Sequence, residues 1–249
     1  MTQSSYPSAP ITEAVIEIKF TEPLSLDEIE KASEKFRDEY PQHHHIQTFA
    51  VNVQMPDGRA AEPTAKFDQE MGHRRGSIDM TELLLIWRSA FVTSQLAPYP
   101  GWESFFQRFV RDWRTWKRLV GFRQISRLGV RYINRIDIPV SGSIVQHEEY
   151  LNVYPKLPDA LGNVGAYAVQ AIMLIEEIGC RLTLNSAAIP SPILDHASFL
   201  FDQDIAKEID PPQSDEAIFD LLNLIRVHKN RVFEECITDR ARELFINGR

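Results

Sequence analysis

Arginine recurs at every fourth position in one segment of the chain, the stretch RLGVRYINRIDIP at residues 127–139. Alternate residues of a β-strand point to the same face, so a strand here places Arg127, Arg131 and Arg135 on one side. Guanidinium groups in such a row can bind an anionic partner, or they can neutralise acids on a neighbouring strand.

An acidic pair with the same spacing lies in a second predicted strand, near the start of the chain. In the stretch TEAVIEIKF, Glu13 and Glu17 share one face. If the two halves of the chain repeat one pattern, these two strands open their halves and lie side by side at the centre of a sheet. Glu13 and Glu17 then face Arg131 and Arg135, and each opposite-charge pair stabilises the sheet by roughly 0.2–1 kcal/mol. The alternatives are a face that binds an anionic partner and scattered exposure to solvent.

A second row of arginines lies on an amphipathic helix predicted for residues 102–120. At 100° per residue, its apolar residues fall within an arc of about 140°, and four arginines fall within an opposing arc of about 120°. We expect the apolar arc to form core, with Trp113 almost fully buried, and the basic arc to be exposed. The apolar residues are Trp102, Phe105, Phe106, Phe109, Trp113, Trp116, Leu119 and Val120, and the basic ones are Arg108, Arg111, Arg114 and Arg118.

Residues 101–135 concentrate positive charge, with nine Arg or Lys and two acids in a chain whose net charge is −8. One interpretation is a solvated face that is screened by acids elsewhere. The other is a docking strip for an acidic protein or for a nucleic-acid backbone. On the second interpretation, the candidate partner-binding residues are Arg108, Arg111, Arg114, Arg118, Arg127, Arg131 and Arg135.

Three consecutive histidines, His43, His44 and His45, are candidates for a metal site. They follow Pro41 in a predicted loop and precede a strand, in which neighbouring side chains point to opposite faces. Tetrahedral zinc needs three or four convergent ligands, which are usually spaced apart in the sequence. We therefore interpret this run as a solvated loop and predict no metal there.

The stretch LDHASFLFDQD contains a second candidate cluster, made of Asp195, His196, Asp202 and Asp204. In a strand Asp202 and Asp204 share a face, as a hydrolytic magnesium site requires. A solvent-facing strand end explains the same residues, and we prefer that interpretation. The sequence predicts neither a metal nor another cofactor.

Motifs of common enzymes are absent from the sequence. It contains no GxGxxG or GxxxxGK[ST] phosphate loop, no GxSxG elbow and no HExxH helix. Its two cysteines, Cys180 and Cys236, lack a CxxC spacing, and we interpret both as small core residues. The expectation for NTPase, hydrolase or redox chemistry is correspondingly low.

Composition indicates an ordinary globular protein, with 43% hydrophobic and 25% charged residues among 249. The net charge of −8 disfavours non-specific binding to nucleic acid or to an anionic membrane. The sequence contains no apolar run of the ~20 residues that a membrane helix needs, and its opening residues lack a secretory pattern. These features predict a cytoplasmic protein that does not contact a membrane.

The predicted elements follow the same order in both halves of the chain: strand, helix, three or four strands, long helix. In the first half they are a strand at 9–20, a helix at 25–40 with Ser25 as its cap, strands within 46–55 and 73–97, and the helix at 102–120. In the second half they are a strand at 127–139, one or two helical turns at 148–155, strands within 165–206, a helix at 211–235 capped by Ser214, and a short helix at 238–245.

This order predicts an α+β fold in a single domain, residues 1–249. We expect two pseudo-repeated halves, 11–121 and 126–249, that form one curved antiparallel sheet with the long helices packed on one face. TATA-binding-protein-like and helix-grip folds have this arrangement, a comparison that carries no function. The alternative is an α+β protein without internal symmetry.

Three stretches of the chain carry a family resemblance: YPSAPITEAVIEIKF at 6–20, RLGVRYINRIDIP at 127–139 and KNRVFEECITDRARELF at 229–245. With these motifs the chain resembles a sporadically distributed, uncharacterised family of bacterial proteins. The resemblance implies neither an activity nor a cofactor nor a catalytic residue. Its patchy distribution, typical of mobile or defence-associated genes, implies a role that depends on a partner.

The leading functional hypothesis is a non-catalytic interaction protein with a protein partner, as the partner-recognition component of a phage-defence or toxin–antitoxin system. One alternative is a metal-dependent hydrolase acting on nucleic acid or nucleotide, built around the aspartates of residues 195–204. Another is a protein that binds a small molecule in the concavity between sheet and helices. The sequence does not predict the oligomeric state.

Overall fold

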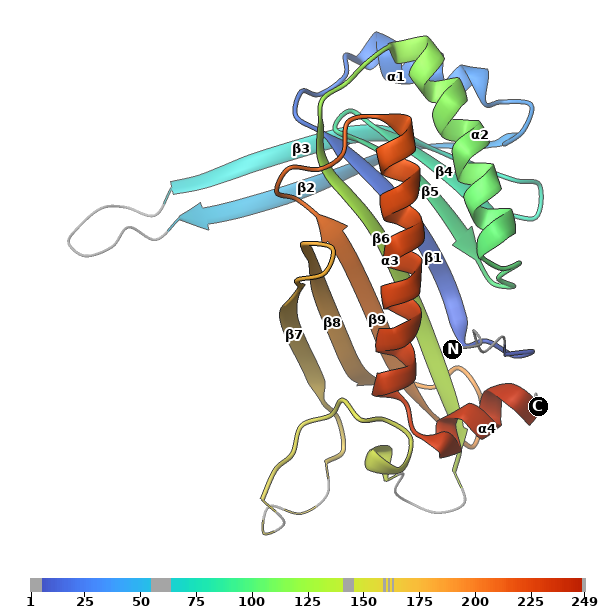
Figure 1. The fold of residues 1–249 in the computed structure, drawn as a ribbon, viewed down its shortest axis with the longest axis vertical. Coiled ribbons are helices and arrows are strands. Elements are labelled where there is room, and N and C mark those ends of the chain that lie inside the picture. The colour runs from blue at the N-terminus through green and yellow to red at the C-terminus, as the bar shows by residue number, and fades with distance from the viewer. Residues whose placement is uncertain are drawn as a thin grey trace, which may run out of the picture.

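Nine antiparallel strands form one sheet in the computed structural model, which describes residues 6–54, 64–140, 146–158, 160, 162 and 164–247. The strands are β1 (Ile11–Phe20), β2 (Gln42–Gln54), β3 (Thr64–Gly76), β4 (Glu82–Trp87), β5 (Ala90–Leu96), β6 (Ile125–Pro139), β7 (Ala168–Ile175), β8 (Cys180–Ile189) and β9 (His196–Lys207). Their order across the sheet is β2-β3-β4-β5-β1-β6-β9-β8-β7 (Figure 1). The expected α+β class with an antiparallel sheet is confirmed.

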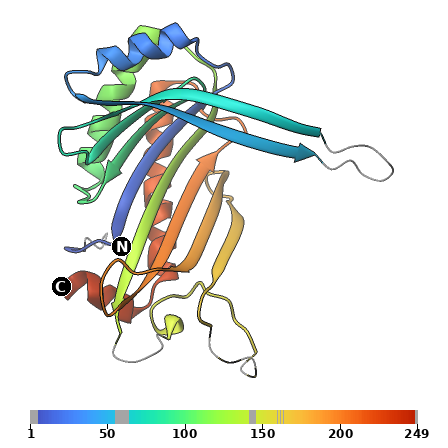
Figure 2. The ribbon, with the colours of Figure 1, turned by 180° about the vertical axis from the view of Figure 1, so that it is seen from behind.

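The long helices lie on one face of this sheet. They are in front of the sheet in Figure 1 and behind it in Figure 2, which is the view from the other side. The helices are α1 (Leu26–Lys35), α2 (Trp102–Val120), α3 (Asp215–Cys236), α4 (Asp239–Asn247) and the short 3₁₀ helix η1 (His147–Glu149). None of the helices in the described ranges is both long and apolar enough to cross a bilayer.

The strands that open the two halves, β1 and β6, pair with each other near the centre of the sheet, as expected. Ile16 lies opposite Val130, and Ile18 lies opposite Leu128. All four side chains are fully buried against the helices. Since side chains alternate along a strand, the residues between them point to the other face of the sheet.

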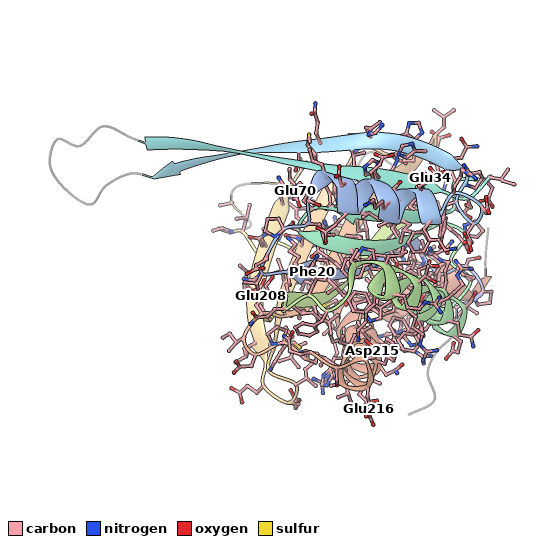
Figure 3. All side chains as sticks on the ribbon, turned by 90° about the horizontal axis from the view of Figure 1, so that it is seen from above. Phe20, Glu34, Glu70, Glu208, Asp215 and Glu216 are labelled. Carbon is pink, nitrogen blue, oxygen red and sulfur yellow. The ribbon has the colours of Figure 1, made fainter. Side chains whose placement is uncertain are left out.

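Aromatic rings from α2 form the centre of the core, as its apolar arc predicts. The Trp116 ring stacks on Phe20, labelled in Figure 3, with 4.7 Å between the ring centroids. Trp113 is 3% exposed, and its indole Nε1 donates a hydrogen bond of 2.9 Å to Asp215 at the start of α3. The exception to the predicted arc is Leu119, which is exposed near the end of the helix.

Local sequence signals explain where α1 and α3 begin. The Ser25 hydroxyl accepts from the backbone N–H of Glu28, and the Glu28 carboxylate accepts from the backbone N–H of Ser25. This capping box satisfies two N–H groups that the first turn leaves without partners. At the start of α3 the Ser214 hydroxyl accepts from the backbone N–H of Ala217, so Ser214 is the cap, as predicted.

The β2 and β3 strands are longer than the sequence indicates. Residues 43–45 belong to β2 rather than to a loop, and residues 64–72 belong to β3 rather than to a turn. Each strand supplies the other's backbone hydrogen-bond partners over thirteen residue pairs, which overrides the local turn signals. Only Gly72–Gly76 of β3 also pairs with β4. The remaining paired residues, 47–54 of β2 and 64–71 of β3, form a two-stranded ribbon that extends beyond the sheet (Figure 1). We call it the β2–β3 ribbon.

Truncation of Trp113 tests the packing of α2. We expect Trp113→Ala to lower the free energy of unfolding by ~3–5 kcal/mol, because it opens a cavity among stacked rings and removes a hydrogen bond. Leu119→Ala on the same helix is the matched control and should cost less than ~1 kcal/mol. Urea unfolding measures both, and a similar small loss for the two variants would contradict this packing.

Candidate functional site

The arginines of α2 do not form the exposed row that the sequence predicts, because Arg108 is buried, with 6% of its surface exposed. Its guanidinium donates hydrogen bonds to the backbone oxygen of Ser94 at 2.8 Å and to the hydroxyl of Tyr40 at 3.2 Å. These bonds join α2 to β5 and to the chain after α1. Arg108 therefore holds the fold together rather than lining a surface, and its expected exposure is wrong.

Asp112 is a buried acid of α2, close to Arg108 and Arg111. It is 1% exposed and accepts hydrogen bonds from the Tyr40 hydroxyl at 2.5 Å and from Arg111 Nε at 2.8 Å. Burial raises the pKa of Asp112, and these donors partly oppose that rise. Arg114 and Arg118 remain exposed, and within the described residues neither pairs with a carboxylate.

The arginines of β6 lie on the opposite face of the sheet from α2. Leu128 and Val130, which alternate with them, are buried beneath the helices. The seven candidate arginines of residues 108–135 are therefore divided between two faces of the sheet. They do not form one continuous strip, which a charge count along the chain could not show because it does not distinguish faces. Their role in docking a partner stays a prediction.

Arg127 is shared by three carboxylates on the face away from the helices. Its guanidinium bonds Glu17 of β1, lies 2.5 Å from Asp204 of β9, and lies 3.4 Å from Glu208. Burial by itself lowers the pKa of Arg127, but the charges of Asp204 and Glu17 raise it above the ordinary value. The side chain is 13% exposed, so these partners shield it from solvent.

Acid–arginine pairing across strands occurs as expected, but with different partners. Arg131 makes two bonds of 2.8 Å to Asp202 of β9, and Arg135 bonds Asp137 of its own strand at 3.0 Å. Glu17 pairs with Arg127 rather than with Arg131, and Glu13 accepts from the Ser94 hydroxyl. The expected partners are wrong because β9, the other neighbour of β6, places Asp202 directly against Arg131.

The predicted hydrolase cluster is not one site. Asp202 and Asp204 share a face as expected, but each is already bonded to an arginine of β6. Asp195 and His196 lie at the start of β9, about six residues before Asp202 and hence roughly 20 Å from it at 3.3 Å per residue. The four residues do not converge on one ion.

A hollow of about 430 Å³ lies over this charged face. Four acids and four basic side chains line it, so their formal charges cancel. Such a lining has no excess charge to attract a polyanion or a metal ion. The charged residues are Glu13, Glu17, Asp204, Glu208, Lys19, Arg127, Arg131 and Arg181, with Glu208 labelled in Figure 3.

The β7 strand presents an apolar edge that sequence reasoning missed. Among the described residues it is the last strand of the sheet, and it pairs with β8 alone. Its sequence, AVQAIMLI, contains neither charge nor proline. Ile172 is 60% exposed, Met173 44% and Leu174 64%. Natural proteins usually protect an edge strand with charges, prolines or bulges, and β7 has neither charges nor prolines.

The histidine run lies in β2, where His43 and His45 share a face with His73 of β3. Burial lowers the pKa of His43 and of His73, which keeps both imidazoles neutral at neutral pH. Cys180 and Cys236 are buried, as expected, and burial raises the pKa of each thiol to about 11. These thiols are poor nucleophiles.

Comparison with known proteins identifies no family. No protein-family model and no curated protein matches the chain. Among solved structures, a chain of S. pombe Pct1 RNA triphosphatase, solved in complex with the Spt5 CTD, matches at 9% identity over 96% of this chain and 87% of that one, with a TM-score of 0.14. A TM-score this low carries no argument about fold or function.

A double-mutant cycle tests the shared arginine. We expect Arg127→Met and Glu17→Gln to show a coupling of about 0.5–3 kcal/mol in the free energy of unfolding, because each removes the other's partner. Arg131→Met with Glu17→Gln is the control cycle, and it should be additive within about 0.5 kcal/mol because Arg131 bonds Asp202. Equal coupling in both cycles would show that Arg127 is not the partner of Glu17.

Proposed function

We propose that this protein binds a protein partner, which adds a β-strand to the free edge of β7. The observation that carries the proposal is the exposure of three consecutive large apolar side chains on an uncharged edge strand. An extended segment that pairs with this edge gains main-chain hydrogen bonds, and its side chains gain apolar contacts.

Both faces of β7 offer apolar contacts to such a partner. Ile172 and Leu174 share one face of the strand, and Met173 lies on the other. A partner strand therefore meets apolar surface on both sides, which favours a segment that is itself apolar. Met173 adds an unbranched side chain that adapts to differently shaped neighbours.

Arg111, Arg114 and Arg118 supply a second, basic surface on α2 in this proposal, while the buried Arg108 and the shared Arg127 stabilise the fold. Acidic protein chains suit this surface, and a nucleic-acid backbone is the alternative ligand. The proposal also includes the cytoplasmic location expected from the composition of the chain, and the role as recognition component of a phage-defence or toxin–antitoxin system that the family resemblance implies. The two halves, 11–121 and 126–249, are pseudo-repeats of one curved sheet in the same proposal, supported by the central pairing of β1 with β6.

Charge substitution at the edge tests the proposal. We expect Ile172→Lys to abolish capture of a specific protein from a lysate of the native host, because a lysine on the edge opposes strand addition. Leu194→Lys, at a residue that is 90% exposed outside the sheet, is the matched control and should capture the same protein as the unaltered chain. Quantitative mass spectrometry of the captured proteins measures the difference.

Hydrogen exchange locates the contact once the partner is known. Amides of β7 should exchange more slowly in the complex, whereas those of the central strand β1 should be unchanged. Equal capture by Ile172→Lys and by the control, or unchanged exchange in β7, would overturn the proposal.

A further inference from the structure

Three imidazoles from neighbouring strands converge at the root of the β2–β3 ribbon. His43 and His45 share one face of β2, and His45 lies directly opposite His73 of β3. One ring nitrogen of each histidine lies within 4.8 Å of those of the other two. Within the described ranges this is the only group of three or more His, Cys, Asp or Glu side chains that is arranged to hold an ion.

The separations of these nitrogens suit a single small ion. Nε2 of His43 and Nδ1 of His73 lie 2.9 Å apart. Two nitrogens bound to tetrahedral zinc at 2.0–2.1 Å are about 3.3 Å apart. The pair therefore needs to open by only a few tenths of an ångström. The third nitrogen, on the exposed His45, lies within 4.8 Å of the other two and has to move closer to them.

Glu30 of α1 lies beside the buried member of this group. Its carboxylate lies 3.4 Å from Nε2 of His73, whereas Nδ1 of His73 faces His43. If this carboxylate accepts the Nε2 proton when a metal binds, the lone pair of Nδ1 is left for the metal. Histidine ligands in metalloproteins commonly have such a partner. His73 is 4% exposed, so packing also restricts the ring.

Arg75 is the cation that shares this face of β3 with His73. Its guanidinium donates to the Ser33 hydroxyl at 2.9 Å and to the carboxylate of Glu34, labelled in Figure 3, at 3.1 Å. The carboxylates of Glu30 and Glu34 therefore offset the charge of Arg75 beside the imidazoles.

We propose that His43, His45 and His73 bind one Zn²⁺ ion through three imidazole nitrogens, with the fourth position open to water. Imidazole ligands suit zinc, whereas magnesium and calcium take oxygen ligands. Three protein ligands with one exchangeable position are a common zinc arrangement. The ion enters from the solvent side, where His45 is exposed. It joins the edge strand β2 to β3 and, through Glu30, to α1.

Metal titration of the full chain without an affinity tag tests the site. We expect the chelator-treated protein to bind one Zn²⁺ per chain in calorimetry. Co²⁺ should give the intense visible absorption of four-coordinate cobalt. Zinc should also raise the midpoint of thermal unfolding, since the unfolded chain lacks the site.

The matched pair of variants is His45→Ala and His44→Ala. Both residues lie in the histidine run, but His44 points to the opposite face of β2. We expect His45→Ala to weaken zinc binding at least ~100-fold, because even second-shell changes cost 10–100-fold. His44→Ala should leave affinity and the zinc-dependent thermal shift unchanged. Glu30→Gln should weaken binding by about 10–100-fold and keep one ion per chain.

The possible outcomes distinguish a specific zinc site from non-specific metal binding by a run of histidines. Equal losses in His44→Ala and His45→Ala, or six-coordinate cobalt spectra, would show adventitious binding and overturn the proposal. Absence of stoichiometric binding to the folded chain would overturn it as well. Both variants replace exposed side chains, so circular dichroism without metal should show the unaltered fold.

Discussion

The pairing of β1 with β6 is the constraint on which the other contacts of this molecule depend. Its register directs Ile16 and Val130 toward the helices, and Glu17 and Arg127 toward the opposite face. A shift by one residue would invert both sets, placing charges in the core and apolar side chains in solvent. The aromatic core of α2 and the ion pairs of the open face therefore require the same register.

Features set by neighbours in the sequence could be predicted from the residues. The capping box of α1, the apolar arc of α2 and the alternation in β1 each arise within one element. The central position of β1 and β6 followed from the order of elements. The burial of Arg108 could not be predicted from the sequence. It depends on contacts with Tyr40 and Ser94, and helix periodicity gives no information about such distant residues.

The candidate sites depend on contacts between distant segments, so the sequence indicates their parts but not their assembly. The run His43–His45 looks like a solvated loop until β3 brings His73 beside it. Asp202 looks like a metal ligand until β9 pairs with β6 and places Arg131 against it. The apolar run in β7 is typical of a buried strand. Only the strand order shows that it ends the sheet.

The sharing of Arg127 among Glu17, Asp204 and Glu208 has a consequence for evolution. A single substitution that removes the arginine leaves three carboxylates close together without a neutralising cation. Loss of one carboxylate changes the charge balance between the arginine and the two carboxylates that remain. These positions are therefore coupled, and change at one selects for change at the others. Homologous sequences that keep this fold should vary at positions 17, 127, 204 and 208 together, as a charge-balanced set rather than as independent sites.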